Sequence, residues 1–290
     1  MLQLTRVLVP VDFSERCLGA VRYAGAIARK FKSQIVLLHA LEPLRYDFST
    51  LEFGGAVMAD FIRNRSDQAR RQLEGLMAGE LEDVCVERVL VEGDPAQRIV
   101  AYAREHHVDL IAMPTHGYGP FRRFILGSVT AKVLHDADCP VLTGVHMENQ
   151  RVSEGLPLRA VLCAVDLGPQ SRKTTCWAAH FADAAGARLM LTHAIPCIEA
   201  QSGEYFDSEL ADDLKRSSRE ELQKLCGALD FDAEVLVESG DPPRTVCEVA
   251  ASSGADLLVI GRGSAAGVFG RLRTSAYSII RESPCPVVSV

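Results

Sequence analysis

The chain repeats its own sequence pattern once. An apolar segment ending in aspartate, a segment ending in His-Ala, a Gly-Asp-Pro turn and a Cys-Pro-Val ending occur in this order in each half. The paired segments are 7–12 with 161–166, 37–40 with 191–194, 92–95 with 239–242, and 139–142 with 285–288. They lie 154 residues apart early in each half and 146 to 147 apart later. Such self-similarity indicates repeated structural units, so we expect two domains, 1–147 and 158–290, joined by a polar linker.

Length and composition narrow the class of protein. With 290 residues, each copy is long enough for its own core, and 48% hydrophobic with 24% charged residues is typical of a globular chain. The net charge of −7 argues against binding to nucleic acid, which depends on neutralising phosphates. No apolar run reaches the length of a membrane span, and no signal peptide pattern is seen. The nine cysteines form no Cys-x-x-Cys pair. We therefore expect a cytoplasmic protein with reduced, mostly buried thiols and no membrane partner.

Apolar strand patterns alternate with helical periods in each copy. In the first copy the expected strands are 6–11, 34–40, 84–91, 108–113 and 140–145, the expected helices are 15–31, 61–79, 95–106 and 128–136, and 43–60 is expected to be a loop. Ser14 and Asp94 are expected to cap helices. This order predicts an α/β fold with a doubly wound, five-stranded parallel sheet in each copy. Ligands bind such sheets where the winding reverses, beyond strands one and four.

The loop after the fourth strand of the first copy holds the parts of a phosphate site. Gly117 and Gly119 allow tight turns, and Gly127-Ser128 stands where a helix begins. Free amides and the helix dipole favour an anion there, and Arg122 and Arg123 add positive charge. Asp12, across the switch point, could accept hydrogen bonds from a base or ribose.

This loop resembles the universal stress protein family, whose nucleotide-binding members have Gly-x2-Gly-x9-Gly-Ser/Thr at this place. Gly117, nine residues and Gly127-Ser128 match the last two elements, whereas Pro114 replaces the first glycine. The Val-Pro-Val-Asp-Phe-Ser opening at 9–14, the Gly-Asp-Pro turns and the Cys-Pro-Val endings are also similar to this family, over both copies. The resemblance implies a Rossmann-like fold of the adenine nucleotide alpha hydrolase type. It also implies an intramolecular pseudo-dimer in which 141–145 pairs antiparallel with 287–290, and the fused chain could dimerise again.

The same resemblance assigns the candidate site. Asp12 would face the adenine and ribose, Ala40 would lie near the base, and Gly117, Gly127 and Ser128 would hold phosphates. Proline has no N–H, so Pro114 could offer only its carbonyl or packing. The expected nucleotide-binding residues are Pro10, Val11, Asp12, Ala40, Met113, Pro114, Thr115, His116, Gly117, Arg123, Gly127, Ser128 and Val129. The expected ligand is ATP, accompanied by Mg²⁺, with no metal ligated by the protein.

The second copy departs from the pattern. Gly261 is present, but Ser264 replaces the second glycine, and the third aligns with Arg273 or Thr274. A side chain at that place would fill the space of a phosphate, so we expect weak or no nucleotide binding. Arg262, like Arg271 and Arg273, is interpreted as a solvated surface arginine, although these could attract another anion.

Other chemistry is weakly supported. The dinucleotide-like Gly261-x-Gly263-x-x-Ala266 follows the fourth strand, which is the wrong place for that motif. His39 and His193 recur in both copies and are interpreted as satisfied strand-end imidazoles. His116 is expected to be a phosphate-side donor or solvent-exposed rather than a general base.

The preferred function is a stress-response protein that binds ATP as a regulatory ligand. No base with an orienting partner is evident, so it is at most a weak ATPase. One alternative is an interaction module that binds an unknown protein and no nucleotide. Another is a site for a different anionic or lipophilic ligand that uses residues 43–60.

Overall fold

The computed structural model describes residues 2–43, 55–116, 126–144, 158–196, 208–262 and 274–290. Within these ranges the strands are β1 (Arg6–Pro10), β2 (Gln34–Leu41), β3 (Val86–Glu92), β4 (Leu110–Ala112), β5 (Val141–Thr143), β6 (Ala160–Ala164), β7 (Arg188–Ile195), β8 (Glu234–Ser239), β9 (Leu257–Ile260) and β10 (Val287–Ser289). The helices are α1 (Glu15–Phe31), α2 (Gly55–Gly75), the 3-10 turn η2 (Gly79–Leu81), α3 (Pro95–Glu105), α4 (Ser128–Asp136), α5 (Ser171–Ala185), α6 (Ser208–Leu229), α7 (Pro242–Ser252) and α8 (Thr274–Glu282).

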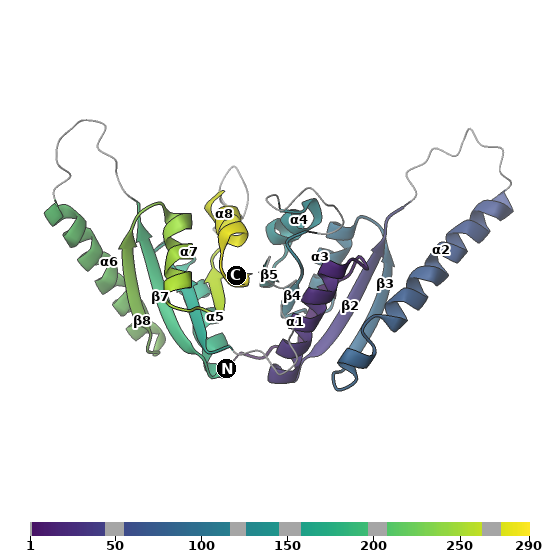
Figure 1. Ribbon diagram of the computed structural model, residues 1–290, viewed down its shortest axis with the longest axis horizontal. Coiled ribbons are helices and arrows are strands. Elements are labelled where there is room, and N and C mark those ends of the chain that lie inside the picture. The colour runs from purple at the N-terminus through teal and green to yellow at the C-terminus, as the bar shows by residue number, and fades with distance from the viewer. Residues whose placement is uncertain (1, 44–54, 117–125, 145–157, 197–207, 263–273) are drawn as a thin grey trace, which may run out of the picture.

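All ten strands form one sheet, in the order β3-β2-β1-β4-β5-β10-β9-β6-β7-β8. Each copy contributes five parallel strands, and its winding reverses between its first and fourth strands, as the alternation of strands and helices predicted. The two copies meet through the antiparallel pair β5–β10, in which Val288 lies opposite Leu142. Figure 1 shows the halves side by side, with the C-terminus at the centre and α2 and α6 at the outer ends. The predicted pseudo-dimer is confirmed.

Helices cover both faces of this sheet because strand side chains alternate between the faces. Val7 and Val9 of β1 belong to a core with α1, α2, α5 and α6. Leu8, between them, belongs to a second core with α3, α4, α7 and α8. Each parallel strand is therefore buried on both sides, which explains why the strands are apolar runs.

Local capping explains where several helices begin. Ser14 accepts a hydrogen bond from the Cys17 N–H at 3.3 Å, and Asp94 accepts one from the Gln97 N–H at 3.0 Å. Both caps were predicted, and α1 begins and ends at the expected residues. Asp241 repeats the Asp94 cap in the second copy by accepting from the Arg244 N–H.

The boundaries of α2 differ from the sequence expectation. The helix begins at Gly55, not Phe61, and ends at Gly75 rather than Gly79. The predicted loop at 43–60 is therefore wrong for 55–60, and residues 44–54 lie outside the described ranges. Alanine and methionine at 56–59 favour helix over the glycine pair before them. The glycines near the other end are poor helix formers, and the chain continues as the separate turn η2.

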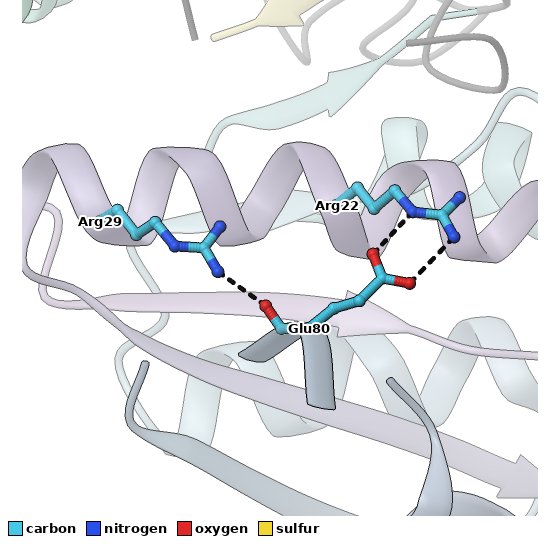
Figure 2. A network of polar contacts seen from close by, with 3 residues as sticks. All are labelled: Arg22, Arg29 and Glu80. Carbon is cyan, nitrogen blue, oxygen red and sulfur yellow. Dashed lines mark hydrogen bonds and ion pairs between the residues drawn. The ribbon is translucent and has the colours of Figure 1, made fainter. Parts of the chain in front are cut away.

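Arginines on α1 hold η2 in place (Figure 2). The Arg22 guanidinium binds both Glu80 carboxylate oxygens, at 2.9 and 3.1 Å, and Arg29 donates to the Glu80 carbonyl at 2.7 Å. A Cβ at Gly25 would lie 2.9 Å from Cδ2 of Leu81. The glycine therefore permits the close approach of η2 to α1, and the arginines orient it.

Aromatic rings add a second junction between the copies. Phe31, at the end of α1, lies 5.2 Å from Phe181 of α5, measured between ring centroids. Trp177 stacks on Phe181 at 5.0 Å. The first-copy helix α1 and the second-copy helix α5 therefore share one hydrophobic core.

Candidate functional site

Residues from three strands gather where the winding of the first copy reverses. Leu8 of β1 lies opposite Ile111 of β4, so two residues further on Pro10 and Met113 reach the same level of the sheet. The Val11 N–H donates to the Leu38 carbonyl of β2 at 2.9 Å. Ala40 follows two residues later on β2, half-buried. The five predicted residues Pro10, Val11, Asp12, Ala40 and Met113 therefore lie at the same carboxyl edge.

Asp12 shapes the turn that follows β1. Its Oδ1 accepts hydrogen bonds from the backbone N–H of Ser14 at 3.0 Å and from the Ser14 hydroxyl at 2.5 Å. In the second copy, Asp166 likewise accepts from the Gly168 N–H and the Ser171 hydroxyl. The paired aspartates thus have a structural role in both turns. The carboxylate of Asp12 is half-buried beside the switch point.

Two equivalent histidines support these turns. Nδ1 of His39 lies 2.7 Å from the Val11 carbonyl, and Nδ1 of His193 lies 2.8 Å from the Val165 carbonyl. A carbonyl can only accept, so each ring nitrogen donates. The interpretation of both residues as satisfied strand-end imidazoles is confirmed.

The first turn of α4 presents backbone donors at this edge. The Gly127 N–H is already bonded to the Thr115 carbonyl at 2.8 Å, and the first helical bond runs from Ala131 to Gly127. The N–H groups of residues 128, 129 and 130 precede that bond, as expected for the first turn of a helix. Ser128 is exposed. These amides and the Ser128 hydroxyl, rather than the Gly127 amide, are the donors suited to an anion.

Gly127 is needed for packing against the preceding loop. A Cβ there would lie 3.3 Å from the Thr115 carbonyl oxygen and 3.5 Å from Cα of His116. Thr130 of α4 adds a hydrogen bond from its hydroxyl to the Pro114 carbonyl at 3.1 Å. Hydrogen bonds therefore hold the N-terminal end of α4 against residues 114 and 115, which follow β4.

His116 lies beneath this edge and not in solvent. Its side chain is buried, and Nδ1 lies 2.9 Å from the Thr115 hydroxyl. The expectation of solvent exposure is wrong, because only 6% of the surface of His116 is exposed. Gly117, Arg122 and Arg123, which complete the predicted phosphate loop, lie outside the described residues.

The thiol closest to Asp12 is not a nucleophile. Cys17 is buried, and burial raises its pKa to about 11, with a further contribution from the Asp12 carboxylate. The thiol is thus protonated at neutral pH.

The second copy is built differently at the same place. A Cβ at Gly261 would lie 3.0 Å from the Thr174 hydroxyl of α5, so α5 occupies the space beside this glycine. Arg262 is buried, with 5% of its surface exposed, and binds carbonyls of the first copy. Its interpretation as a solvated surface arginine is wrong. Sequence reasoning missed both contacts because they join residues far apart in the chain.

A separate cleft of about 780 Å³ lies at the opposite, amino-terminal edge of the second copy, between α5, β7 and the α6–β8 turn. In the described ranges, no group of three or more His, Cys, Asp or Glu side chains could hold a metal ion. The same ranges contain no helix both long and apolar enough to span a bilayer.

Comparison with known proteins agrees with the duplication. The model of the universal stress protein family matches twice, at residues 3–143 and 157–290. A universal stress protein from Methanothermobacter thermautotrophicus is 38% identical over 142 residues, covering 49% of this chain and 96% of the relative. One from Methanocaldococcus jannaschii is 31% identical over 150 residues, covering 47% and 92%.

Among solved structures, a universal stress protein from Archaeoglobus fulgidus aligns over 99% of this chain and 96% of its own, with a TM-score of 0.70 and 22% identity. At that identity the match concerns the fold, including its tandem arrangement. Taken with the two family matches, it leads to one conclusion: the chain belongs to the universal stress protein family and contains two copies of its domain.

Proposed function

We propose that the first copy, residues 1–147, binds ATP or a related adenine nucleotide as a regulatory ligand, whereas the second copy, 158–290, does not. The observation that carries this proposal is the position of the α4 N-terminus. Its first-turn amides and the exposed Ser128 lie at the carboxyl edge of the sheet, at the switch point that also holds Asp12. A helix N-terminus favours phosphate through its free N–H groups and its dipole.

The residues present fit the parts of such a ligand. The amides of Ser128 and Val129 and the Ser128 hydroxyl would hold phosphate oxygens, and Asp12 would accept from ribose hydroxyls. Ala40 and Met113 would border the base. Gly117 and Arg123 belong to the proposal through their sequence pattern. Mg²⁺ would accompany the triphosphate as its counter-ion.

A regulatory role fits these groups better than catalysis. The Cys17 thiol is protonated, as its raised pKa of about 11 requires. His116 is buried, and its Nδ1 contacts the Thr115 hydroxyl. We therefore propose that ATP hydrolysis is slow at most. The protein would act in the cytoplasm by binding the nucleotide, not by turning it over.

Ser128→Glu tests the proposal with little risk to the fold. A carboxylate within about 5 Å of a phosphate oxygen repels it by roughly 1–3 kcal/mol, which weakens binding about 5- to 150-fold. A glutamate at the start of a helix is itself favourable, so thermal stability is expected to be unchanged. Gly127→Glu is less suitable because any Cβ there contacts the Thr115 carbonyl.

The second copy provides a matched control. Ser275 is exposed on the first turn of α8 and lies 147 residues after Ser128. Ser275→Glu adds the same charge to the equivalent helix and should leave ATP affinity, measured by isothermal titration calorimetry, unchanged. Equal weakening by both variants, or no ATP binding by the wild type at millimolar concentration, would refute the proposal.

One observation favours the interaction module as a second candidate. Phe61 and Ile62 of α2 are 54% and 47% exposed, which is unusual for large apolar side chains on one helix. This second function would be supported if the wild type binds a protein partner but no ATP, and if the substitutions Phe61→Ser and Ile62→Ser abolish the binding of that partner.

A further inference from the structure

Arg262 belongs to the second copy but makes its side-chain contacts in the first. Its backbone follows β9 and donates to the Val290 carbonyl at 3.2 Å. Its Nη1 donates to the Ala137 carbonyl at 2.6 Å and the Leu134 carbonyl at 3.4 Å, and its Nη2 donates to the Cys139 carbonyl at 2.8 Å. These bonds join residues more than 120 positions apart, across the β5–β10 junction.

The three carbonyls lie at or just after the C-terminal end of α4: Leu134 is in its last turn, Ala137 follows it directly, and Cys139 lies two residues further on. The last carbonyls of a helix have no partner within it and carry partial negative charge. A guanidinium satisfies several of them at once and is itself stabilised there, which offsets the cost of burying its charge. Arg262 therefore caps α4 from the other copy. Figure 1 shows α4 and α8 on either side of the middle of the molecule, where this contact is made.

The opposite end of α4 is the proposed anion site. The helix has only nine residues, from Ser128 to Asp136, and is about 13 Å long. A helix this short has little stability of its own and depends on its contacts. Thr130 holds the N-terminal end through its bond to the Pro114 carbonyl, and Arg262 holds the C-terminal end. The orientation of the first-turn amides thus depends on a residue of the second copy.

The second copy satisfies the equivalent of the Cys139 carbonyl locally. Ser283, at the position equivalent to Ala137, donates its hydroxyl to the Cys285 carbonyl at 2.7 Å and accepts from the Cys285 N–H. Ala137 has no hydroxyl, so the equivalent Cys139 carbonyl receives the Arg262 guanidinium instead. The Cys139 carbonyl and its equivalent at Cys285 are therefore satisfied by different means, one from across the junction and one locally.

We propose that Arg262 is a positioning residue for the nucleotide site of the first copy, so that the divergent second copy controls the geometry of the site it no longer contains. This inference rests on the proposed function. It assigns the second copy a defined role, in which Arg262, directly after β9, supports α4.

The test compares Arg262→Met with Arg262→Lys in the full chain. Methionine removes every donor, whereas lysine keeps a charge near the helix end but loses the planar pair of donors. We expect Arg262→Met to weaken ATP binding about 2- to 30-fold, as residues coupled to a site without touching the ligand do. Amide hydrogen exchange in residues 128–137 should accelerate, and lysine should restore both measurements in part.

Arg88 offers a matched control. It donates to the carbonyls of Leu73 and Leu76, at 2.9 and 3.3 Å, at the C-terminal end of α2 within the first copy. Arg88→Met removes the same kind of cap away from the site, so it should lower stability and leave ATP affinity unchanged.

The outcomes separate the two proposals. Faster exchange in α4 with unchanged ATP affinity would reduce Arg262 to a structural role and overturn the inference. Unchanged exchange would show that Arg262 does not hold α4, which also overturns it. If the wild type binds no ATP, the proposed function itself fails, and the positioning role fails with it. If Arg262→Met does not fold, the lysine variant supplies the same comparison.

Discussion

The contact between Phe31 and Phe181 allows a direct test of whether the two copies form one cooperative unit. Phe181 is buried, with 1% of its surface exposed, and its ring lies 5.2 Å from Phe31 of the other copy. Leucine in place of either ring keeps an apolar side chain but removes some volume, so each single variant should cost about 0.5–3 kcal/mol. An aromatic pair contributes about 0.5–1.5 kcal/mol beyond its buried area. The double variant should therefore be less destabilised than the sum of the single variants, by about that amount.

Urea unfolding measures each free energy. Trp177 is the single tryptophan and stacks on Phe181, so its fluorescence reports the second copy. Far-UV circular dichroism reports the whole chain, and both signals should give one coincident transition. As a control, Phe31→Leu combined with Val249→Ala, on the opposite face of the second copy, should be additive within about 0.5 kcal/mol. Additivity of the Phe31 and Phe181 variants, or separate transitions for the two signals, would refute the shared core.

Two further predictions concern stability. Arg22 and Arg29 lower the pKa of the Glu80 and Asp83 carboxylates, respectively, below their ordinary values of 4.5 and 3.8. A lowered carboxylate pKa contributes stability that is present above the ordinary value and lost as the pH falls through the folded value. The pair of Arg22 with Glu80 is exposed, so Glu80→Gln should remove only about 0.2–1 kcal/mol of it. The difference in unfolding free energy between wild type and variant should therefore be largest above about pH 4.5 and shrink as the pH falls below it. A difference that stays constant from neutral to acid pH would contradict this. Separately, His39→Phe leaves the Val11 carbonyl without its donor and should cost about 1–3 kcal/mol. His193→Phe should cost a similar amount at Val165, and thermal unfolding of both variants at the wild-type midpoint would argue against the two imidazole bonds.

Features set by neighbouring residues were predictable from sequence. The bounds of α1 follow from the Ser14 cap and an apolar period on one face. The order of strands follows from the alternation of strands with helices and the handedness of their connections. The antiparallel β5–β10 junction was expected through the resemblance, since each copy ends in a short apolar strand.

Side-chain contacts between distant segments were not predictable. The burial of His116 after β4 is encoded by no local pattern. Arg262 appeared to be a surface residue because the carbonyls it binds are contributed by the other copy. The start of α2 at Gly55 was also not predicted, because a pair of glycines weakens a helix but does not prevent one. Comparison of the two copies gives one usable signal. Ala137 stands where the second copy has Ser283, so the carbonyl that the Ser283 hydroxyl binds in the second copy needs another donor in the first, and Arg262 provides it.

The stoichiometry of ATP binding tests the central claim most directly, namely that the first copy keeps an anion site that the second has lost. Equilibrium titration of the full chain with Mg²⁺–ATP should give one site per chain, abolished or strongly weakened by Ser128→Glu and unaffected by Ser275→Glu. Two equivalent sites per chain, or a single site that responds to Ser275→Glu and not to Ser128→Glu, would contradict the account.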